Sequence, residues 1–372
     1  MRLFQLDDQI EVDRVFFKQP IDFTKYTPKE QLRYCVGAAL YMPAIKQSIA
    51  ADIINRKFSS LTSIVIDLED ALGDLQVAAG KENLVKTFRQ LDDAMKNGQL
   101  TIEQLPLLFM RVRSPQQLKE MIELLGDSQH VLTGYVLPKF TASNGRAFLE
   151  LVAQQNELGY CLYAMPILES ADIMYKETRL EALLQIKTIL TEYYDYILNI
   201  RVGATDFSGL YGIRRKVNTT IYDIAPVRDC LTDIINLFNR ADMDFVLSGP
   251  VWEYFSSEDS EIATNVPLQG LIREVQLDQL NGLIGKTIIH PTHITAVNAL
   301  YVVTHEEYLD AVEVLHHSNG QIGVKKSAYN NKMNEMNPHV LWAQRISMRA
   351  QVYGVYNPQV NYLSLLMGQV KA

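Results

Sequence analysis

The sequence lacks the features that mark secreted, membrane or nucleic-acid-binding proteins. Its three cysteines are odd in number and far apart, which indicates reduced thiols rather than a disulfide framework. No apolar run approaches the roughly 18 residues of a membrane helix, and the opening MRLFQLDDQIEVD is too acidic for a signal peptide. Lysine and arginine total 35 against 43 acidic residues, with no basic cluster. We therefore expect a cytoplasmic protein with neither a membrane nor a nucleic-acid partner.

Short apolar runs dominate the pattern that is present. Eight of them, rich in β-branched residues, are each followed by a longer stretch of helical period. Continuous apolarity, rather than alternation, is typical of parallel strands covered by helices. One helix is predicted from Pro115, after a capping Ser114, to Leu125 before Gly126. The runs lie at residues 36–42, 63–68, 106–112, 134–140, 161–168, 197–203, 244–249 and 286–290.

The number of these units points to a barrel of the α/β class. Eight strand–helix units between residues 43 and 290 match the roughly 250 residues of a (β/α)₈ TIM barrel. A doubly wound open sheet would more usually carry a glycine-rich phosphate loop after its first strand, where this chain reads MPAIK. We predict an N-terminal arm at residues 1–35, a (β/α)₈ barrel at 36–303 and a C-terminal helical extension at 304–372.

Charged residues close several of the predicted strands. Active sites of such barrels lie at the carboxyl ends of the strands, and partly buried charges that converge there must find partners. We therefore expect a site at this end of the barrel. The charged strand ends are Asp67, Glu69 and Asp70 after the second strand, Arg111 and Arg113 after the third, Lys139 after the fourth, Glu169 after the fifth, Asp206 after the sixth and His290 after the eighth.

Glu169 and Asp206 end adjacent predicted strands and can point at a common centre. Two carboxylates, completed by water and substrate oxygens, are typical of Mg²⁺ or another divalent cation such as Mn²⁺. No cysteine or histidine pair lies nearby in the sequence, which argues against zinc. The spacing leaves a second reading open, in which one carboxylate caps the following helix and the other pairs with an arginine.

The basic strand ends also have two readings each. Arg111 is suited to a bidentate grip on a substrate carboxylate, or to an internal ion pair with Glu69 or Asp70. Lys139 could form a Schiff base, although we favour its pairing with the carboxylates after the second strand. For the pair in His290-Pro-Thr-His293 we favour a hydrogen-bonded structural role over metal binding.

Eight short motifs at the strand ends form an ordered set along the chain. They are LYMP (40–43), IDLEDAL (66–72), the arginine of MRV (110–112), GYVLPK (134–139), PILES (166–170), GATDFSGLYG (203–212), SGP (248–250) and GKTIIHP (285–291). Read in this order, they resemble the citrate lyase beta-subunit group of the HpcH/HpaI aldolase superfamily. The tail KMNEMNPHVLWAQRI (332–346) is also similar to a less characterised branch of predicted carbon–carbon bond lyases.

The resemblance implies a metal-dependent lyase or aldolase. Such an enzyme cleaves or forms a bond next to a carbonyl in a small keto or hydroxy acid, or in its thioester, through a Mg²⁺-stabilised enolate. Glu169 and Asp206 align with the metal ligands and Arg111 with the carboxylate-binding arginine, while Glu69 and Asp70 would orient water, Arg111 or Lys139. Glu335 aligns with an acidic residue that reaches a neighbouring subunit's active site, which implies a homo-oligomer with the tail as a lid.

Some motifs depart from the family pattern. Members that use coenzyme A thioesters usually have an arginine where this chain has Gly37 and Ala38, and AGKENLVK (79–86) replaces their K-x-x-A-R. Arg214 and Arg215 could replace this phosphate grip, or could form a solvated turn. Two alternatives therefore stay open beside the metal-dependent lyase. One is a class I aldolase that uses Lys139, and the other is an inactive barrel that binds a metabolite or partner as a scaffold.

Overall fold

The computed structural model describes residues 1–4, 6, 9–58, 60–256, 262–318 and 322–369. These residues fall into two compact units, which we call the barrel unit (Met1 and Phe23–Ile294) and the tail unit (Arg2–Asp22 and Thr295–Ala372). Across the described ranges, no helix combines the length and the apolar character needed to cross a membrane. The division into arm, barrel and extension at residues 35/36 and 303/304 stays a prediction.

The described part of the barrel unit contains one eight-stranded sheet in which every paired strand is parallel. The order of the strands is β8-β7-β6-β5-β4-β3-β2-β9, and each strand overlaps one of the eight predicted apolar runs. The strands are β2 (Ala38–Pro43), β3 (Ser63–Asp67), β4 (Leu107–Arg111), β5 (Gly134–Leu137), β6 (Tyr163–Leu168), β7 (Ile200–Val202), β8 (Leu247–Ser248) and β9 (Lys286–Ile288).

Hydrogen bonds between the last two strands bring the sheet round into a barrel. The amide of Ile284 donates to the carbonyl of Leu247 (2.7 Å), and the amide of Gly249 donates to that of Gly285 (2.9 Å). The amide of Thr287 in turn donates to the carbonyl of Gly249 (3.1 Å). The predicted TIM barrel is therefore confirmed, and the open-sheet alternative is excluded because β8 and β9 would be its free edges.

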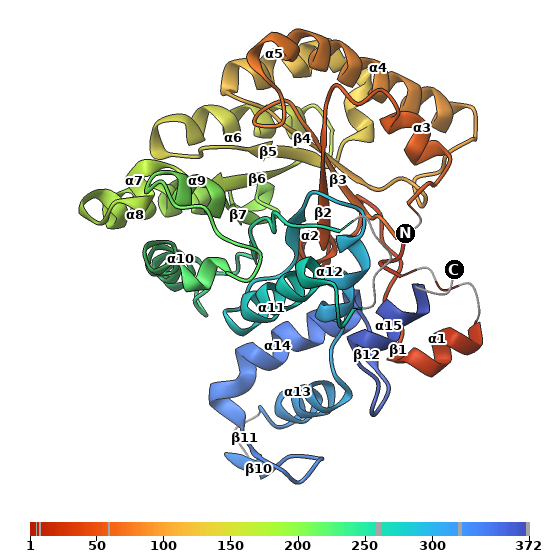
Figure 1. Cartoon of the computed structure of the whole chain (residues 1–372), viewed down its shortest axis with the longest axis vertical. Helices are drawn as coiled ribbons and strands as arrows, with labels where there is room; N and C mark the ends of the chain where they lie inside the picture. Colours follow the sequence, from red (N-terminus) through yellow and green to blue (C-terminus); the bar gives the residue numbers. More distant parts are fainter. Residues whose placement is uncertain (5, 7–8, 59, 257–261, 319–321, 370–372) are drawn as a thin grey trace. The chain divides into compact units, whose positions relative to one another are not determined.

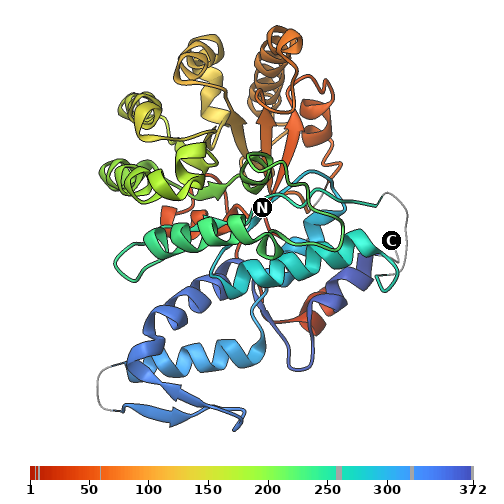
Figure 2. The same ribbon diagram turned by 60° about the vertical axis from the view of Figure 1, so that its left-hand side comes forward.

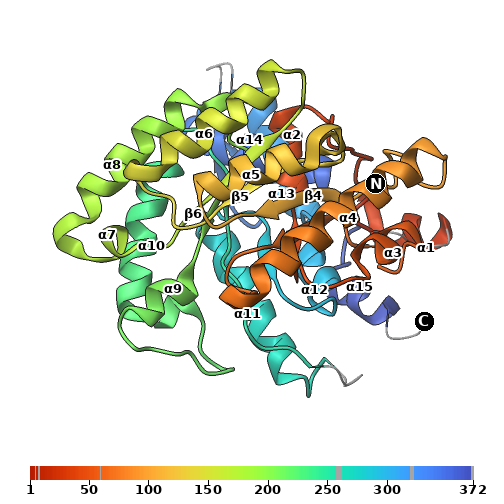
Figure 3. The same ribbon diagram turned by 90° about the horizontal axis from the view of Figure 1, so that it is seen from above.

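Helices connect successive strands and cover the outside of the sheet, as Figures 1 and 3 show for α4, α5 and α6 beside β3, β4 and β5. The predicted helix after Ser114 is confirmed as α5, with the Ser114 hydroxyl accepting from the amide of Gln117 and with Leu118 and Met121 fully buried. The connecting helices are α3 (Ile49–Ile54), η1 (Asp74–Gln76), α4 (Val77–Lys96), α5 (Pro115–Leu125), η2 (Gly126–Val131), α6 (Ala142–Glu157), α7 (Ala171–Met174), α8 (Lys176–Glu192), η3 (Tyr194–Tyr196), α9 (Ala204–Gly209), η4 (Ile221–Asp223), α10 (Ala225–Phe238) and α11 (Val266–Leu280).

Basic side chains close the amino end of the barrel. Helix α2 (Lys29–Cys35) leads into β2, and its Arg33 contacts Asp244, which precedes β8, at 2.7 Å. The Lys25 ammonium donates to the carbonyl of His130 (2.6 Å) in the segment before β5. Burial lowers the pKa of Lys25 to about 8. The opposite end, where the charged strand ends lie, is thus the one available for a site.

The tail unit joins the two ends of the chain. Strand β1 (Phe16–Lys18) pairs antiparallel with β12 (Val355–Tyr356), so the N-terminal segment belongs with the C-terminal one. Helix α13 (His305–His317) packs against α14 (Met336–Val352) around buried residues that include Val314 and Ile346, which confirms the predicted helical C-terminal part. Figure 2 shows these two helices beside the hairpin of β10 (Val324–Lys326) and β11 (Met333–Glu335). The remaining helices are α1 (Gln9–Val15), α12 (His293–Tyr301), within which the unit boundary falls, and α15 (Tyr362–Gln369).

Candidate active site

Arg111 is fixed at the end of β4 by the neighbouring strand. The parallel register places Asp67, the last residue of β3, directly beside it. The guanidinium donates from Nε to Asp67 Oδ1 (2.7 Å) and from Nη2 to Oδ2 (2.5 Å), and both side chains are buried. Burial lowers the pKa of Arg111, but the hydrogen bond and charge of Asp67 outweigh it and raise the pKa overall.

Glu69 and Asp70 extend this ion pair into a network. Arg111 Nη1 lies 3.0 Å from Glu69 Oε2 and 3.3 Å from Asp70 Oδ2. The Lys139 ammonium pairs with Glu69 and lies 3.5 Å from Asp70. Burial opposes the charge of Lys139, yet Glu69 and Asp70 raise its pKa overall. Arg111 and Lys139 therefore both form the internal ion pairs that the sequence left as one of two readings.

Arg113, the next basic residue along the chain, holds the loop that carries these carboxylates. Its guanidinium donates to the carbonyls of Leu68 (2.8 Å) and Leu72 (2.6 Å) and lies 2.6 Å from Asp74. A guanidinium that caps backbone carbonyls fixes the path of the chain. Arg113 therefore positions the loop that bears Glu69 and Asp70.

Glu169 and Asp206 form a pair of carboxylates at the same end of the barrel. Glu169 follows β6 and is 5% exposed, whereas Asp206 lies in the first turn of α9, after β7, and is half-buried. Burial, followed by the charge of Asp206, raises the pKa of Glu169 to about 8. Burial and the charge of Asp70 raise the pKa of Asp206. Each carboxylate is thus held in a place that disfavours its negative charge.

The surroundings of this pair agree better with a bound cation than with the alternative in which one carboxylate caps the following helix and the other pairs with an arginine. Gly203, not Asp206, is the residue that precedes α9, and within the described ranges neither Glu169 nor Asp206 has a basic side chain at ion-pair distance. Two adjacent carboxylates without a counter-ion fit a divalent cation, which would offset both desolvation and mutual repulsion. No cluster of three or more histidine, cysteine or acidic residues able to hold a metal occurs in the described part of the chain.

Two backbone features set the position of Glu169. The amide of Lys139 donates to Glu169 Oε1 (2.8 Å), and Lys139 adopts a φ of 46°, which is costly for a residue with a side chain. On the other side, Gly203 has no side chain to occupy the space of Glu169. A Cβ there would lie 2.1 Å from Glu169 Oε2 and 2.5 Å from its Cβ. Gly203 is therefore required for close approach, at a φ of −95° that any residue can adopt.

Two further residues lie inside the barrel beneath this network, and the sequence reasoning missed their role. Tyr41 of β2 presents its ring to the guanidinium carbons of Arg111 (5.3 Å) and Arg201 (6.0 Å). Arg201 of β7 is 1% exposed. A charged residue inside the mainly apolar run ILNIRVG (197–203) is the signal that would have found it.

The two histidines after β9 are hydrogen-bonded, as the sequence favoured. The His290 ring stacks on Phe255 at 4.4 Å and its Nδ1 lies 2.8 Å from the hydroxyl of Thr292. His293 is buried, and its Nε2 lies 3.1 Å from the carbonyl of Tyr254, so that Nε2 carries the proton. Burial, with His290 nearby, lowers the pKa of His293 to about 4.

The suggestion that Arg215 grips coenzyme A phosphates is wrong. Its guanidinium lies 2.8 Å from Glu253 and 2.6 Å from Glu274, which is fully buried. Lys286, also fully buried, joins the same network at 3.0 Å from Glu274 and 2.7 Å from Asp278. Arg215 is thereby committed to a buried ion network behind β9, whereas the adjacent Arg214 is exposed.

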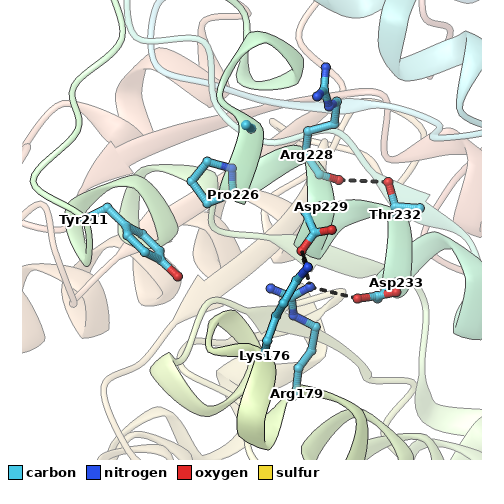
Figure 4. A pocket seen from close by; sticks show the side chains of 9 residues that line it. Lys176, Arg179, Tyr211, Pro226, Arg228, Asp229, Thr232 and Asp233 are labelled. Atoms are coloured by element: carbon cyan, nitrogen blue, oxygen red, sulfur yellow. Dashed lines mark hydrogen bonds and ion pairs between the residues drawn. The ribbon is translucent and has the colours of Figure 1, made fainter.

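A surface pocket of about 530 Å³ lies elsewhere, between α8 and α10 (Figure 4). Figure 4 shows Lys176 and Arg179 pointing toward Asp229 and Asp233. Arg179 Nη1 lies 2.8 Å from each of these two carboxylates, so its charge is already compensated. The pocket belongs to the outer helices and contains none of the charged strand ends.

Glu335 closes strand β11 in the tail unit. It is exposed, and its backbone amide donates to Nδ1 of His339 (3.2 Å). Its contribution to a neighbouring subunit's site stays a prediction.

Comparison with known proteins adds the family. A protein of this fold, CitE from Mycobacterium tuberculosis in complex with magnesium, acetoacetate and coenzyme A, is 19% identical with a TM-score of 0.57, covering 86% of this chain and 99% of that one. Two further structures also match. The citrate lyase beta subunit of M. tuberculosis complexed with oxaloacetate and magnesium is 19% identical with a TM-score of 0.46, covering 72% of this chain and 97% of that one. RipC from Yersinia pestis is 18% identical with a TM-score of 0.44, covering 72% of this chain and 94% of that one. No curated protein matches the sequence.

The family model carries the assignment, because structural similarity at such low identity establishes only the fold. The model that describes C–C bond lyases of the TIM-barrel fold matches residues 30–355, which include every charged strand end described above. The predicted resemblance is thus confirmed, and the chain belongs to the C–C bond lyases of the TIM-barrel fold as a carbon–carbon lyase.

Proposed function

We propose that this lyase cleaves or forms a carbon–carbon bond next to the carbonyl of a small keto or hydroxy acid, with a divalent cation, Mg²⁺ or Mn²⁺, held by Glu169 and Asp206. The observation that supports the proposal is the pair formed by buried Glu169 and half-buried Asp206, whose side chains have no basic ion-pair partner among the described residues. The cation, when bound, supplies positive charge beside the carbonyl oxygen on which negative charge develops.

The basic residues of the network would bind the substrate's carboxylate. Asp67 holds Nε and Nη2 of Arg111, which fixes the plane of the guanidinium. Nη1 faces Glu69 and Asp70, so a substrate carboxylate would take over one of these contacts. The released acidic group would stay paired with Lys139, as Glu69 already is. Arg111 would thus orient the substrate, while Glu69, Asp70 and Lys139 balance its charge.

A Schiff-base mechanism is less compatible with the charge of Lys139. A nucleophilic lysine must lose its proton, which requires a lowered pKa. The pKa of Lys139 is instead raised overall by Glu69 and Asp70. Borohydride treatment in the presence of pyruvate tests the point, since a stable covalent adduct at Lys139 would favour the class I mechanism over the metal-dependent one.

Whether the substrate is a free acid or a coenzyme A thioester is a separate question. The arginine that thioester-using relatives carry is absent at Gly37 and Ala38. Arg215 cannot replace it, because its guanidinium is paired with the buried carboxylate of Glu274. The free acid is therefore the first substrate to test, with malyl-coenzyme A and citramalyl-coenzyme A as the second arm. Turnover of none of these acids or thioesters, with bound cation verified, would favour the scaffold alternative.

Metal binding provides the direct test of this function. We expect wild-type protein to bind Mn²⁺ at millimolar concentration or below, and Glu169→Gln and Asp206→Asn to weaken binding at least about 100-fold, since each removes one of two anionic ligands. Glu192→Gln is the matched control, because Glu192 is an exposed acidic residue on α8. Failure to bind at millimolar Mn²⁺, or unchanged binding in the two site variants, would contradict the metal-dependent mechanism.

The role of the tail is a further part of the proposal. We propose that Glu335 acts in the site of a neighbouring subunit, so that the enzyme works as a homo-oligomer. Mixing inactive Glu335→Gln with inactive Glu169→Gln protein should restore about a quarter of the activity if half the sites in a mixed dimer are intact. An oligomeric protein whose Glu335→Gln variant is fully active would exclude this role.

A further inference from the structure

Arg201 lies within the lumen of the barrel. It is the middle residue of β7, which pairs with β6 on one side and β8 on the other. Its Nη2 nevertheless donates to the hydroxyl of Thr287 on β9 (2.6 Å), a strand beyond β8. A side chain can reach past its neighbouring strand in this way only across the inside of a barrel. The guanidinium is therefore held between strands, one layer below the residues at the carboxyl end.

The guanidinium of Arg201 is poorly compensated. Nε and Nη1 are buried and have no hydrogen-bond partner among the described residues. An arginine stays protonated in proteins and offers five N–H donors, so a buried one without acceptors is costly. Four other arginines of the described chain are also buried, though less completely than Arg201, and each contacts a carboxylate: Arg33, Arg111, Arg179 and Arg215. Arg201 is the exception within this set.

The position of Arg201 links it to the proposed site. The Tyr41 ring has Arg111 at 5.3 Å and Arg201 at 6.0 Å from its centroid, so the two cations share one aromatic neighbour. The chain leaves β7 at Val202, two residues before α9 begins at Ala204, and the first turn of α9 carries Asp206, one of the proposed metal ligands. An acidic substrate bound at Arg111 and the carboxylate pair would thus lie near the donors of Arg201, which are buried and unpaired among the described residues.

We propose that Arg201 binds a second carboxylate of the substrate, so that this lyase acts on keto or hydroxy acids with two carboxylates. This inference rests on the proposed function for the first carboxylate and the cation. The planar guanidinium matches a carboxylate in shape and charge, and a desolvated cation strongly rejects a ligand that leaves it unpaired. Arg201 is a specificity residue in this scheme, since it contacts the part of the substrate that does not react.

Binding of two matched, stable hydroxy acids tests the proposal. Malate and lactate share the 2-hydroxy acid group, and malate carries one more carboxylate. By calorimetry with saturating Mg²⁺, wild-type protein should bind malate at least about tenfold tighter than lactate. Arg201→Met should bring malate to the level of lactate and leave lactate within about twofold. Arg201→Lys should keep part of the preference, because it keeps the charge but not the planar fork.

The control and the stability readout separate binding from folding. Arg214→Met removes the same charge from an exposed arginine beyond the same strand, and it should keep the malate preference. Arg201→Met should melt at the wild-type temperature or above it, because it removes an uncompensated buried charge. Retention of the malate preference in Arg201→Met, or an equal affinity of wild-type protein for both acids, overturns the inference.

The same data distinguish this inference from the proposed function. If Mg²⁺ strengthens binding of both acids equally, and wild-type protein does not prefer malate, the role of Arg201 fails while the metal site stands. If malate binds in an Arg201-dependent manner without any effect of Mg²⁺, the anion site stands while the metal-dependent function fails.

Discussion

Replacing Gly203 by alanine should disturb the proposed metal site without changing any charge. The new Cβ would lie 2.1 Å from Glu169 Oε2, whereas ordinary contacts begin near 3.4 Å, so the two atoms must separate by more than 1 Å. The second contact, 2.5 Å to Glu169 Cβ, means that rotating the carboxylate away does not relieve the clash. Glu169 as a whole must therefore move away from Asp206.

The expected loss follows from this displacement. A ligand misplaced by about 1 Å, or deprived of its supporting contacts, typically costs about 10- to 100-fold in metal affinity, or about 1.4–2.7 kcal/mol. Overpacking of a buried site costs a further 1–3 kcal/mol or so in folding free energy, which a domain stable by about 5–15 kcal/mol survives. We thus expect a folded Gly203→Ala protein that binds Mn²⁺ about 10- to 100-fold more weakly than wild type.

The assay is a Mn²⁺ titration followed by electron paramagnetic resonance, with urea unfolding in parallel. Gly209→Ala is the matched control, since it adds the same methyl group to the end of α9 where no atom lies within 4 Å of the new Cβ. It should bind Mn²⁺ as wild type does. Metal affinity within twofold of wild type in Gly203→Ala would refute the reasoning that places Glu169 at the cation.

Three further predictions concern stability and positioning. Lys286→Met leaves two buried carboxylates without the cation they share, and it should lower the free energy of unfolding in urea by about 3–5 kcal/mol. Lys325→Met breaks a half-exposed ion pair and should lower it by less than about 1 kcal/mol. Equal losses in the two variants would contradict this prediction. His293 is neutral in the fold, with a pKa of about 4, whereas in the unfolded chain it binds a proton near pH 6.5. The free energy of unfolding should therefore fall by up to about 3 kcal/mol as the pH falls from 6.5 to 4. In His293→Gln, the slope of the free energy of unfolding against pH should be flatter in this window. Asp67→Asn should weaken the two hydrogen bonds that fix the Arg111 guanidinium, and thereby raise the KM for a keto acid about tenfold while the Mn²⁺ affinity stays unchanged. An unchanged KM would argue against Arg111 as the carboxylate-binding residue.

The charged strand ends were predictable because the barrel topology itself brings them together. Parallel strands share one carboxyl end, so Glu69, Arg111, Lys139 and Glu169 had to converge once the eight units were recognised. The choice of partners was less predictable. The sequence offered Glu69 or Asp70 to Arg111, but the register of β3 with β4 adds Asp67 as the bidentate partner.

Residues that face the lumen or the outer helices could not be assigned from the sequence. Arg201 lies within one of the apolar runs and Lys286 begins another, yet Arg201 lies inside the barrel and Lys286 points outward to α11. Side chains along a strand point alternately to opposite faces of the sheet, so a single charged position in a three-residue strand does not reveal which face it occupies. Arg215 shows the same limit, since a basic pair in a loop reads as a phosphate grip until its buried partners are known.

By itself, the sequence determined the barrel, its polarity and the set of charges at its carboxyl end, because continuous apolar runs and their charged termini are local features of the chain. The tertiary structure alone decided which charges pair and which residues enter the lumen. It also joined residues 2–22 to the tail through the short pairing of β1 with β12. Those outcomes depend on contacts between segments far apart in sequence, whose energies are set by register and burial rather than by local composition.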